Sequence, residues 1–188
     1  MQEERRCSWV NRKNPLYISY HDTEWGIPLY DDKKLYELLL LESFQAGLSW
    51  ECVLNKRQNF REAFDGFDIE KILLYDEEKI GELLKNPGII RNGRKIRATV
   101  SNSRVFRQIQ KEWGTFSAYI WSFTNGKIVE EEFTMRTTSP LSDAVSKDLK
   151  KRGMTFVGST IIYSFLQAMG VIQGHSKDCM CYGRYRHE

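Results

Sequence analysis

Glu42 is the residue whose chemistry is least expected from its place in the sequence. It lies in the segment LYELLLLESFQAGLSW, residues 35–50, where apolar residues recur at the three- and four-residue spacing of one helical face. Leu38, Glu42 and Ala46 follow one another at intervals of four, so the carboxylate falls on the apolar stripe. A carboxylate is costly to desolvate there without a partner. Either a Lys, an Arg or a backbone N–H pairs with Glu42 in the core, or Glu42 lines a pocket and is kept for a ligand.

A second set of residues could bind a metal. Cys7 and His21 lie near one end of the chain, and His175 and Cys179 lie near the other. The His-x-x-x-Cys spacing predicts two ligands on one side of a helical turn, and two thiolates with two imidazoles form a closed tetrahedral zinc site. The spacing is not that of a zinc finger, and Cys181 could replace Cys179.

A third pattern is a run of basic residues. Residues 83–111 contain no Asp or Glu, but they contain Lys85, Arg91, Arg94, Lys95, Arg97, Arg104, Arg107 and Lys111. The run spans the turn PGIIRNG, residues 87–93, between two predicted helices. Exposed N–H groups of such a turn and the positive end of the next helix suit a phosphate.

This arrangement is similar to a helix-hairpin-helix, an element that binds the DNA backbone. The predicted contacts come from the hairpin and the first turn of the following helix: Gly88, Ile89, Ile90, Arg91, Arg94 and Lys95. The alternative is a solvated helix face. We favour DNA because the charges cluster at a hairpin without any acid.

Helices must position all three sets of residues. Asp31 or Asp32 can cap the Glu42 helix, which Gly47 ends, and capping residues predict further helix starts at Ser49, Asp68 and Asp76. Periodicity predicts longer helices over 94–113, 139–153 and 159–169, a short one over 116–123, and a strand or extended segment over 127–135. Residues 1–30 are expected to be irregular and aromatic. The predicted class is all-α.

Composition narrows the class of protein. The 188 residues fit one domain, possibly with two helical lobes. A net charge of +3 does not by itself indicate nucleic acid. The sequence has no apolar run of the roughly 18 residues that a membrane span needs and no apolar leader, so we expect a cytoplasmic protein without membrane contact. In that compartment four Cys are thiols or metal ligands rather than disulfides.

Six segments in order resemble one family over essentially the whole chain. They are CSWV, PLYISYHDTEWGIP, LESFQAGLSW, PGIIRN, LKKRGMTFVGSTIIYSFLQAMG and HSKDCMCY, and the family is 3-methyladenine DNA glycosylase I. The resemblance implies a helix-hairpin-helix glycosylase fold. It also implies one structural zinc ion per chain on Cys7, His21, His175 and Cys179, which favours Cys179 over Cys181.

The resemblance also implies an activity. The family removes 3-methyladenine from alkylated double-stranded DNA and leaves an abasic site, as the first step of base excision repair. Its pocket falls on Glu42 and Tyr20 as catalytic residues, with Tyr17 and Trp50 against the base and Trp9 and Trp25 close by. Many helix-hairpin-helix glycosylases place a catalytic Asp after the hairpin, and both this chain and the family lack it. Without an obvious hairpin lysine for lyase chemistry, we expect a monofunctional, monomeric enzyme.

The alternative is a DNA-binding module that zinc holds together and that has no catalytic function. Such a module would use the hairpin and the basic helix but not the Glu42 pocket. Release of free 3-methyladenine from methylated DNA distinguishes the two.

Overall fold

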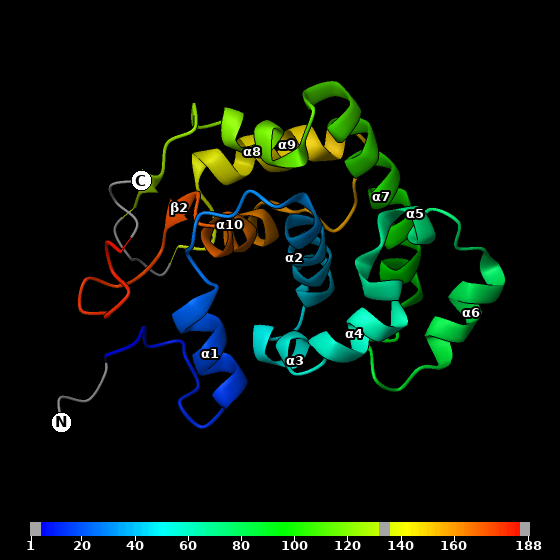
Figure 1. Cartoon of the computed structure of the whole chain (residues 1–188), viewed down its shortest axis with the longest axis horizontal. Coiled ribbons are helices and arrows are strands. Elements are labelled where there is room, and N and C mark those ends of the chain that lie inside the picture. Colours follow the sequence, from blue (N-terminus) through cyan, green and yellow to red (C-terminus); the bar gives the residue numbers. More distant parts are fainter. Residues whose placement is uncertain (1–4, 132–135, 185–188) are drawn as a thin grey trace.

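The computed structural model describes residues 5–131 and 136–184, and this part of the chain is mostly helical (Figure 1). Helix α2 (Asp32–Gln45) lies at the centre. It packs against α10 (Ser159–Ala168), α7 (Gly93–Trp113), α8 (Phe116–Ser122) and α3 (Trp50–Leu54). The predicted all-α class is confirmed, and the central helix is the one that carries Glu42.

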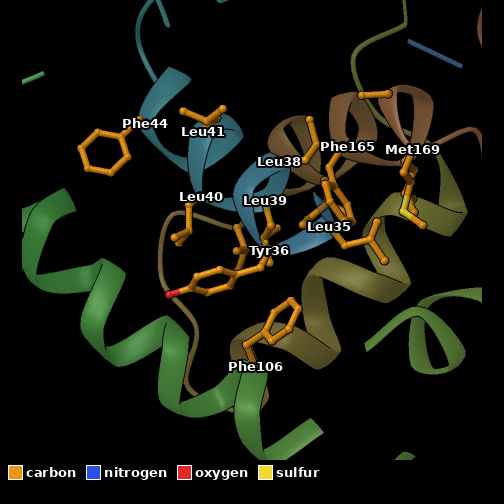
Figure 2. Packing of buried hydrophobic residues seen from close by; sticks show 14 of the residues in the cluster. Leu35, Tyr36, Leu38, Leu39, Leu40, Leu41, Phe44, Phe106, Phe165 and Met169 are labelled. Atoms are coloured by element: carbon orange, nitrogen blue, oxygen red, sulfur yellow. The ribbon is translucent and has the colours of Figure 1, made fainter. Parts of the chain in front are cut away.

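Helix α2 is buried on nearly all sides rather than on one stripe. Figure 2 shows its side chains pointing in several directions, with Phe106 of α7 and Phe165 of α10 among their neighbours. Leu40 and Leu41, outside the predicted apolar face, are each only 1% exposed. The prediction of one apolar face was therefore too narrow, because helices pack around α2 from several directions. Asp31 caps the helix by accepting a hydrogen bond from Lys34 N.

The expectation that residues 1–30 are irregular was wrong for helix α1 (Pro15–Thr23). The side chain of Asn14 accepts a hydrogen bond from Leu16 N, and Pro15 occupies the first helical position, where its missing N–H costs nothing. The helix carries Tyr17, Tyr20 and His21, and the last two are buried. The start signal was local, but the aromatic composition of this segment obscured it.

The middle of the chain is a series of short helices. Ser49, Asp68 and Asp76 cap α3, α5 (Ile69–Ile72) and α6 (Glu77–Lys85) as predicted. The segment after Ser49 is two helices rather than one, because α3 ends at Leu54 and α4 begins at Arg57; α4 (Arg57–Ala63) and the 3-10 helix η1 (Asp65–Phe67) then lead to α5.

Helices α6 and α7 are joined by the predicted hairpin, residues 86–92. Asn92 caps α7 through a hydrogen bond from Lys95 N, and Gly114 ends it with φ of 83°. Helix α9 (Pro140–Lys151) begins at a capping box formed by Ser139 and Ser142.

Two short strands lie beside the helices. Strand β1 (Val129–Glu130) falls within the segment predicted as extended, of which residues 132–135 lie outside the described residues. It pairs in parallel with β2 (Ile172–Gln173). Between residues 5 and 184, with 132–135 left aside, no helix combines the length and the apolar character that crossing a bilayer requires.

Candidate active site and metal centre

A cavity of about 270 Å³ opens between α1, α2, α3 and α10. Its lining residues are Trp9, Tyr17, Tyr20, Trp25, Glu42, Gln45, Trp50, Ser164 and Gln167. The structure thus brings together all six residues predicted for the pocket. Sequence reasoning missed the three polar residues in this wall, Gln45, Ser164 and Gln167. The signal for two of them was a Ser and a Gln three residues apart on a helix otherwise rich in apolar residues.

Glu42 faces this cavity without a protein partner. Glu42 is 3% exposed, and its Oε2 atom is buried without a hydrogen bond. Among the described residues no Lys or Arg forms an ion pair with it. Burial raises its pKa to about 8. The alternative in which a Lys, an Arg or a backbone N–H pairs with Glu42 in the core was therefore wrong.

Aromatic rings form the rest of the wall. The rings of Tyr20 and Trp50 lie 5.3 Å apart at 44°, and those of Trp9 and Trp25 lie 4.8 Å apart at 65°. The Trp50 Nε1 donor is buried without an acceptor. Aromatic faces attract a flat cationic ring, and a buried carboxyl offers it hydrogen bonds and an opposite charge. The pocket therefore suits a positively charged heteroaromatic base.

Four possible metal ligands converge beside this pocket. The ligand atoms of Cys7, His21, His175 and Cys179 all lie within 4.8 Å of one another, and all four residues are buried. Cys179 Sγ lies 3.4 Å from His21 Nε2 and 3.5 Å from His175 Nδ1, and Cys7 Sγ lies 3.5 Å from the same Nδ1. Tetrahedral zinc with bonds of roughly 2.0–2.3 Å separates neighbouring ligands by about 3.6 Å. These residues therefore fit such an ion.

The surroundings of the four ligands also suit a metal. His21 Nδ1 lies 2.7 Å from Asp22 Oδ1, and His175 Nε2 lies 3.3 Å from the Trp25 carbonyl, which leaves the other nitrogen of each ring for an ion. Burial lowers the pKa of His175 to about 4, so this imidazole is neutral at pH 7 as a ligand must be. Ser176 N donates to Cys7 Sγ at 3.5 Å.

The four-ligand cluster contains Cys179 and not Cys181. Cys181 is buried nearby, and its backbone N–H donates to Cys179 Sγ at 3.4 Å. The two ends of the chain meet here, where Met180 N donates to Arg5 O. The prediction of a helical turn between His175 and Cys179 was wrong, because the segment is a series of turns with a hydrogen bond from Cys179 N to Ser176 O.

The four-residue cluster contacts the pocket wall directly. The ring of Trp25 lies 4.6 Å from the ring of His175, and the ring of Trp9 lies 5.3 Å from that of His21. A Cβ at Gly26, where φ is 77°, would lie 2.9 Å from His175 Nε2. Fixing the two imidazoles therefore fixes two of the aromatic side chains that line the cavity.

The hairpin has backbone donors without protein acceptors among the residues that the structure describes. Lys56 Nζ donates to Pro87 O and Gly88 O, and Asn59 Nδ2 donates to Gly88 O. Within residues 5–131 and 136–184, the N–H groups of Ile89, Ile90 and Arg91 have no protein acceptor. Carbonyls held inward and N–H groups left free are what a phosphate site requires.

The basic residues that follow the hairpin have separate roles. Arg91 and Arg94 are exposed, and in the described part of the chain neither forms an ion pair. Arg97 pairs with Glu77 at 2.7 Å, and Arg107 pairs with Glu70. These acids come from other helices, which the local run of sequence could not reveal.

Lys95 does not lie on this surface, contrary to prediction. It is 6% exposed, and its Nζ donates to Phe44 O at 2.8 Å and to Ala46 O at 2.5 Å. Its charge points into the protein because α7 packs against the end of α2. The ammonium is therefore held by backbone carbonyls rather than presented to DNA.

The raised pKa of Glu42 predicts how stability depends on pH. The folded state holds the Glu42 proton more tightly than the unfolded state, so this group makes unfolding easier as pH rises from about 4.5 to about 8. Relative to the wild type, we expect Glu42→Gln to gain on the order of a few kcal/mol of unfolding free energy at pH 8.5 and little at pH 4.5. Urea unfolding at both pH values measures this, and equal differences at the two would contradict it.

The fold and the site together define a helix-hairpin-helix DNA glycosylase, with a hairpin between α6 and α7 and an aromatic pocket that suits a base. A family model described as methyladenine glycosylase matches residues 9–182. The chain is 46% identical over 181 residues to DNA-3-methyladenine glycosylase 1 of Escherichia coli (strain K12), covering 94% of this chain and 96% of that protein. The chain belongs to the 3-methyladenine DNA glycosylase I family.

Solved structures agree. A crystal structure of 3-methyladenine DNA glycosylase I superposes with a TM-score of 0.90 at 45% identity, covering 95% of this chain and 100% of that one. A Tyr-to-Phe variant of 3-methyladenine DNA glycosylase I, solved in complex with 3-methyladenine, superposes with a TM-score of 0.88 at 36% identity, covering 93% of this chain and 96% of that one.

Proposed function

We propose that this protein hydrolyses the N-glycosidic bond of 3-methyladenine in alkylated double-stranded DNA, the first step of base excision repair. The observation that carries the proposal is the unpartnered carboxyl of Glu42 inside an aromatic cavity. Family membership supports it, since relatives carry the name of this activity and one is solved with 3-methyladenine.

The chemistry of 3-methyladenine determines what the pocket must do. The target base must leave the helical stack to be reached. Methylation at N3 makes the ring cationic, so the bond from N9 to the sugar breaks with its electron pair going to a base that leaves neutral. Water then bonds to C1′ of the sugar and gives up a proton. Little acid catalysis is needed, and the protein mainly selects the base and stabilises the sugar cation.

Glu42 selects the cationic base in this scheme. In the empty pocket at pH 7 its carboxyl is mostly protonated, because its pKa is about 8. A cationic ring favours the ionised form, so the proton leaves as the base enters. Trp50 supplies a π face, worth about 0.5–2 kcal/mol for a cation, and stacking adds roughly 1–3 kcal/mol. Tyr17 and Tyr20 orient the base and its sugar.

The loop between α2 and α3 carries an apolar side chain that can fill the gap left in the DNA duplex by the flipped base. Gly47, with φ of 81°, turns the chain so that Leu48 is 43% exposed between pocket residues Gln45 and Trp50. An apolar side chain that enters the stack stabilises an unpaired site. We assign this role to Leu48, which sequence reasoning did not identify.

The hairpin holds the DNA backbone. Free N–H groups of Ile89, Ile90 and Arg91 would bind phosphates, with Arg91 and Arg94 beside them. We expect Arg94→Ala to weaken binding to any DNA sequence several-fold and to reduce the salt dependence by about one phosphate contact. Fluorescence anisotropy from low to high salt measures both. Lys111→Ala, at the far end of α7, is the matched control. An unchanged salt dependence of DNA binding in Arg94→Ala would mean that Arg94 contacts no phosphate and belongs to a solvated helix face.

The metal proposed for the four-ligand cluster is one structural zinc ion. Two thiolates and two imidazoles would complete a tetrahedral site, so the ion would have a structural role. The ion would join the two ends of the chain and hold Trp9 and Trp25 through His21 and His175. We further propose that the chain works as a monomeric single domain in the cytoplasm.

One assay tests the proposed function. The protein is incubated with methylated duplex DNA, and the supernatant is analysed for free bases by chromatography. We expect 3-methyladenine to be released and abasic sites to accumulate without strand cleavage. A protein that binds the DNA without releasing base would instead be the zinc-containing DNA-binding module.

A further inference from the structure

The ammonium of Lys95 occupies an unusual place for a charge. It lies in the first turn of α7, where the positive end of the helix dipole disfavours a cation. It also lies at the C-terminal end of α2, whose last carbonyls lack helical partners and favour one. The Lys95 charge therefore destabilises the N-terminal end of α7 and stabilises the C-terminal end of α2.

The segment that Lys95 holds is the rim of the pocket. Phe44 and Ala46, whose carbonyls it binds, lie between Glu42 and Trp50, each of which has a buried polar atom without a partner. The loop that follows contains the exposed Leu48. On the other side, the Lys95 ammonium lies 5.8 Å from the ring centroid of Phe156, in the connection that leads to α10 with Ser164 and Gln167.

The same residue is tied to the hairpin. Lys95 N donates to the side chain of Asn92, which closes the hairpin, and the exposed Arg94 precedes it. One residue thus bonds through its backbone to the element proposed to hold phosphates and through its side chain to the rim of the base pocket. For a phosphate on the strand that carries the flipped base, the offset between these two sites decides whether the base reaches Glu42.

We propose that Lys95 is a positioning residue that fixes the pocket rim relative to the hairpin, so that backbone binding delivers the flipped base in register with Glu42 and Trp50. The inference rests on the proposed function. It separates Lys95 from its neighbours Arg91 and Arg94: Lys95 governs the rate of base release, whereas they govern DNA affinity.

Lys95→Met tests this, because it keeps most of the stem and removes the bonds to both carbonyls. We expect the dissociation constant for undamaged DNA and its salt slope to stay within about twofold of the wild type, since a buried charge contacts no phosphate. We expect single-turnover release of 3-methyladenine to fall at least tenfold, because a small misplacement of reacting groups costs about that much or more. Lys111→Met, the same change at an exposed position on α7, should leave both values unchanged.

Three outcomes overturn the inference while wild-type protein still releases base. They are a wild-type release rate in Lys95→Met, a weakened affinity with a smaller salt slope, and equal losses in Lys95→Met and Lys111→Met. If the wild type itself releases no base, the proposed function fails instead. Should Lys95→Met not fold, as seen by circular dichroism, Lys95→Arg carries the test. Its larger planar head cannot hold both carbonyls in the same place, so slower release with unchanged affinity supports positioning, and unchanged release contradicts it.

Discussion

Glu42→Gln is expected to lower 3-methyladenine release from methylated DNA by about a hundredfold at pH 8.5. Gln keeps the shape of the Glu42 side chain and one acceptor oxygen, but it cannot carry the negative charge that Glu42 has when a cationic base is bound. Two unit charges about 4 Å apart attract by roughly 4 kcal/mol at an effective dielectric of about 20, before desolvation is subtracted, and a hundredfold corresponds to about 2.7 kcal/mol. Single-turnover chromatography of released bases measures the effect. Glu42→Ala should lose more, since it also removes the contacts to the base edge.

The pH profile gives this prediction its sharpest form. With a pKa of about 8, only roughly a tenth of the free protein carries an ionised Glu42 at pH 7. The kcat/KM of the wild type should therefore rise as pH increases towards about 8 and then level off, while Glu42→Gln should lack this rise. At pH 6 the kcat/KM of the wild type should exceed that of Glu42→Gln by only a few-fold.

A neighbouring carboxylate supplies the control. Glu51 accepts hydrogen bonds from Asn11 and Asn14 and does not line the cavity. Glu51→Gln should keep the wild-type pH profile. If Glu42→Gln releases base at the wild-type rate with the wild-type preference for the cationic base, the carboxyl has no part in recognition.

Loss of the metal is expected to have the second largest effect. Cys179→Ser should bind no stoichiometric zinc and lose several kcal/mol of unfolding free energy, because the binding energy of a structural zinc is also folding energy. Base release should fall with it, since Trp9 and Trp25 rest against the liganding imidazoles. Elemental analysis and thermal unfolding with and without a chelator measure these changes.

Cys181→Ser is the matched control for the metal prediction. Cys181 is buried beside the cluster but is not among its four ligands. This variant should keep one zinc per chain and most of its stability. If Cys181→Ser loses zinc and Cys179→Ser keeps it, the fourth ligand is Cys181 and the prediction is wrong. If the wild type binds no zinc, the proposed structural role is wrong.

What the sequence determined by itself was local. Asp31, Ser49, Asp68, Asp76 and Ser139 cap helices where predicted, because a cap is a contact between a side chain and a backbone N–H two or three residues away. The family motifs extended this to the members of the pocket and of the metal cluster, and the structure brings those residues together. Helix α1 was missed although its start at Asn14 and Pro15 was equally local.

The tertiary structure alone decided which groups have partners. From sequence, Glu42 could have met a cation and Lys95 could have faced solvent, yet Glu42 has no partner and Lys95 is bound to the carbonyls that end the Glu42 helix. The family resemblance already favoured Cys179 over Cys181, and the structure groups Cys179 with residues 7, 21 and 175. The physical reason is that desolvation and ion pairing depend on which groups lie close in space, and Lys95 reaches the carbonyls of Phe44 and Ala46 only when α2 and α7 have packed.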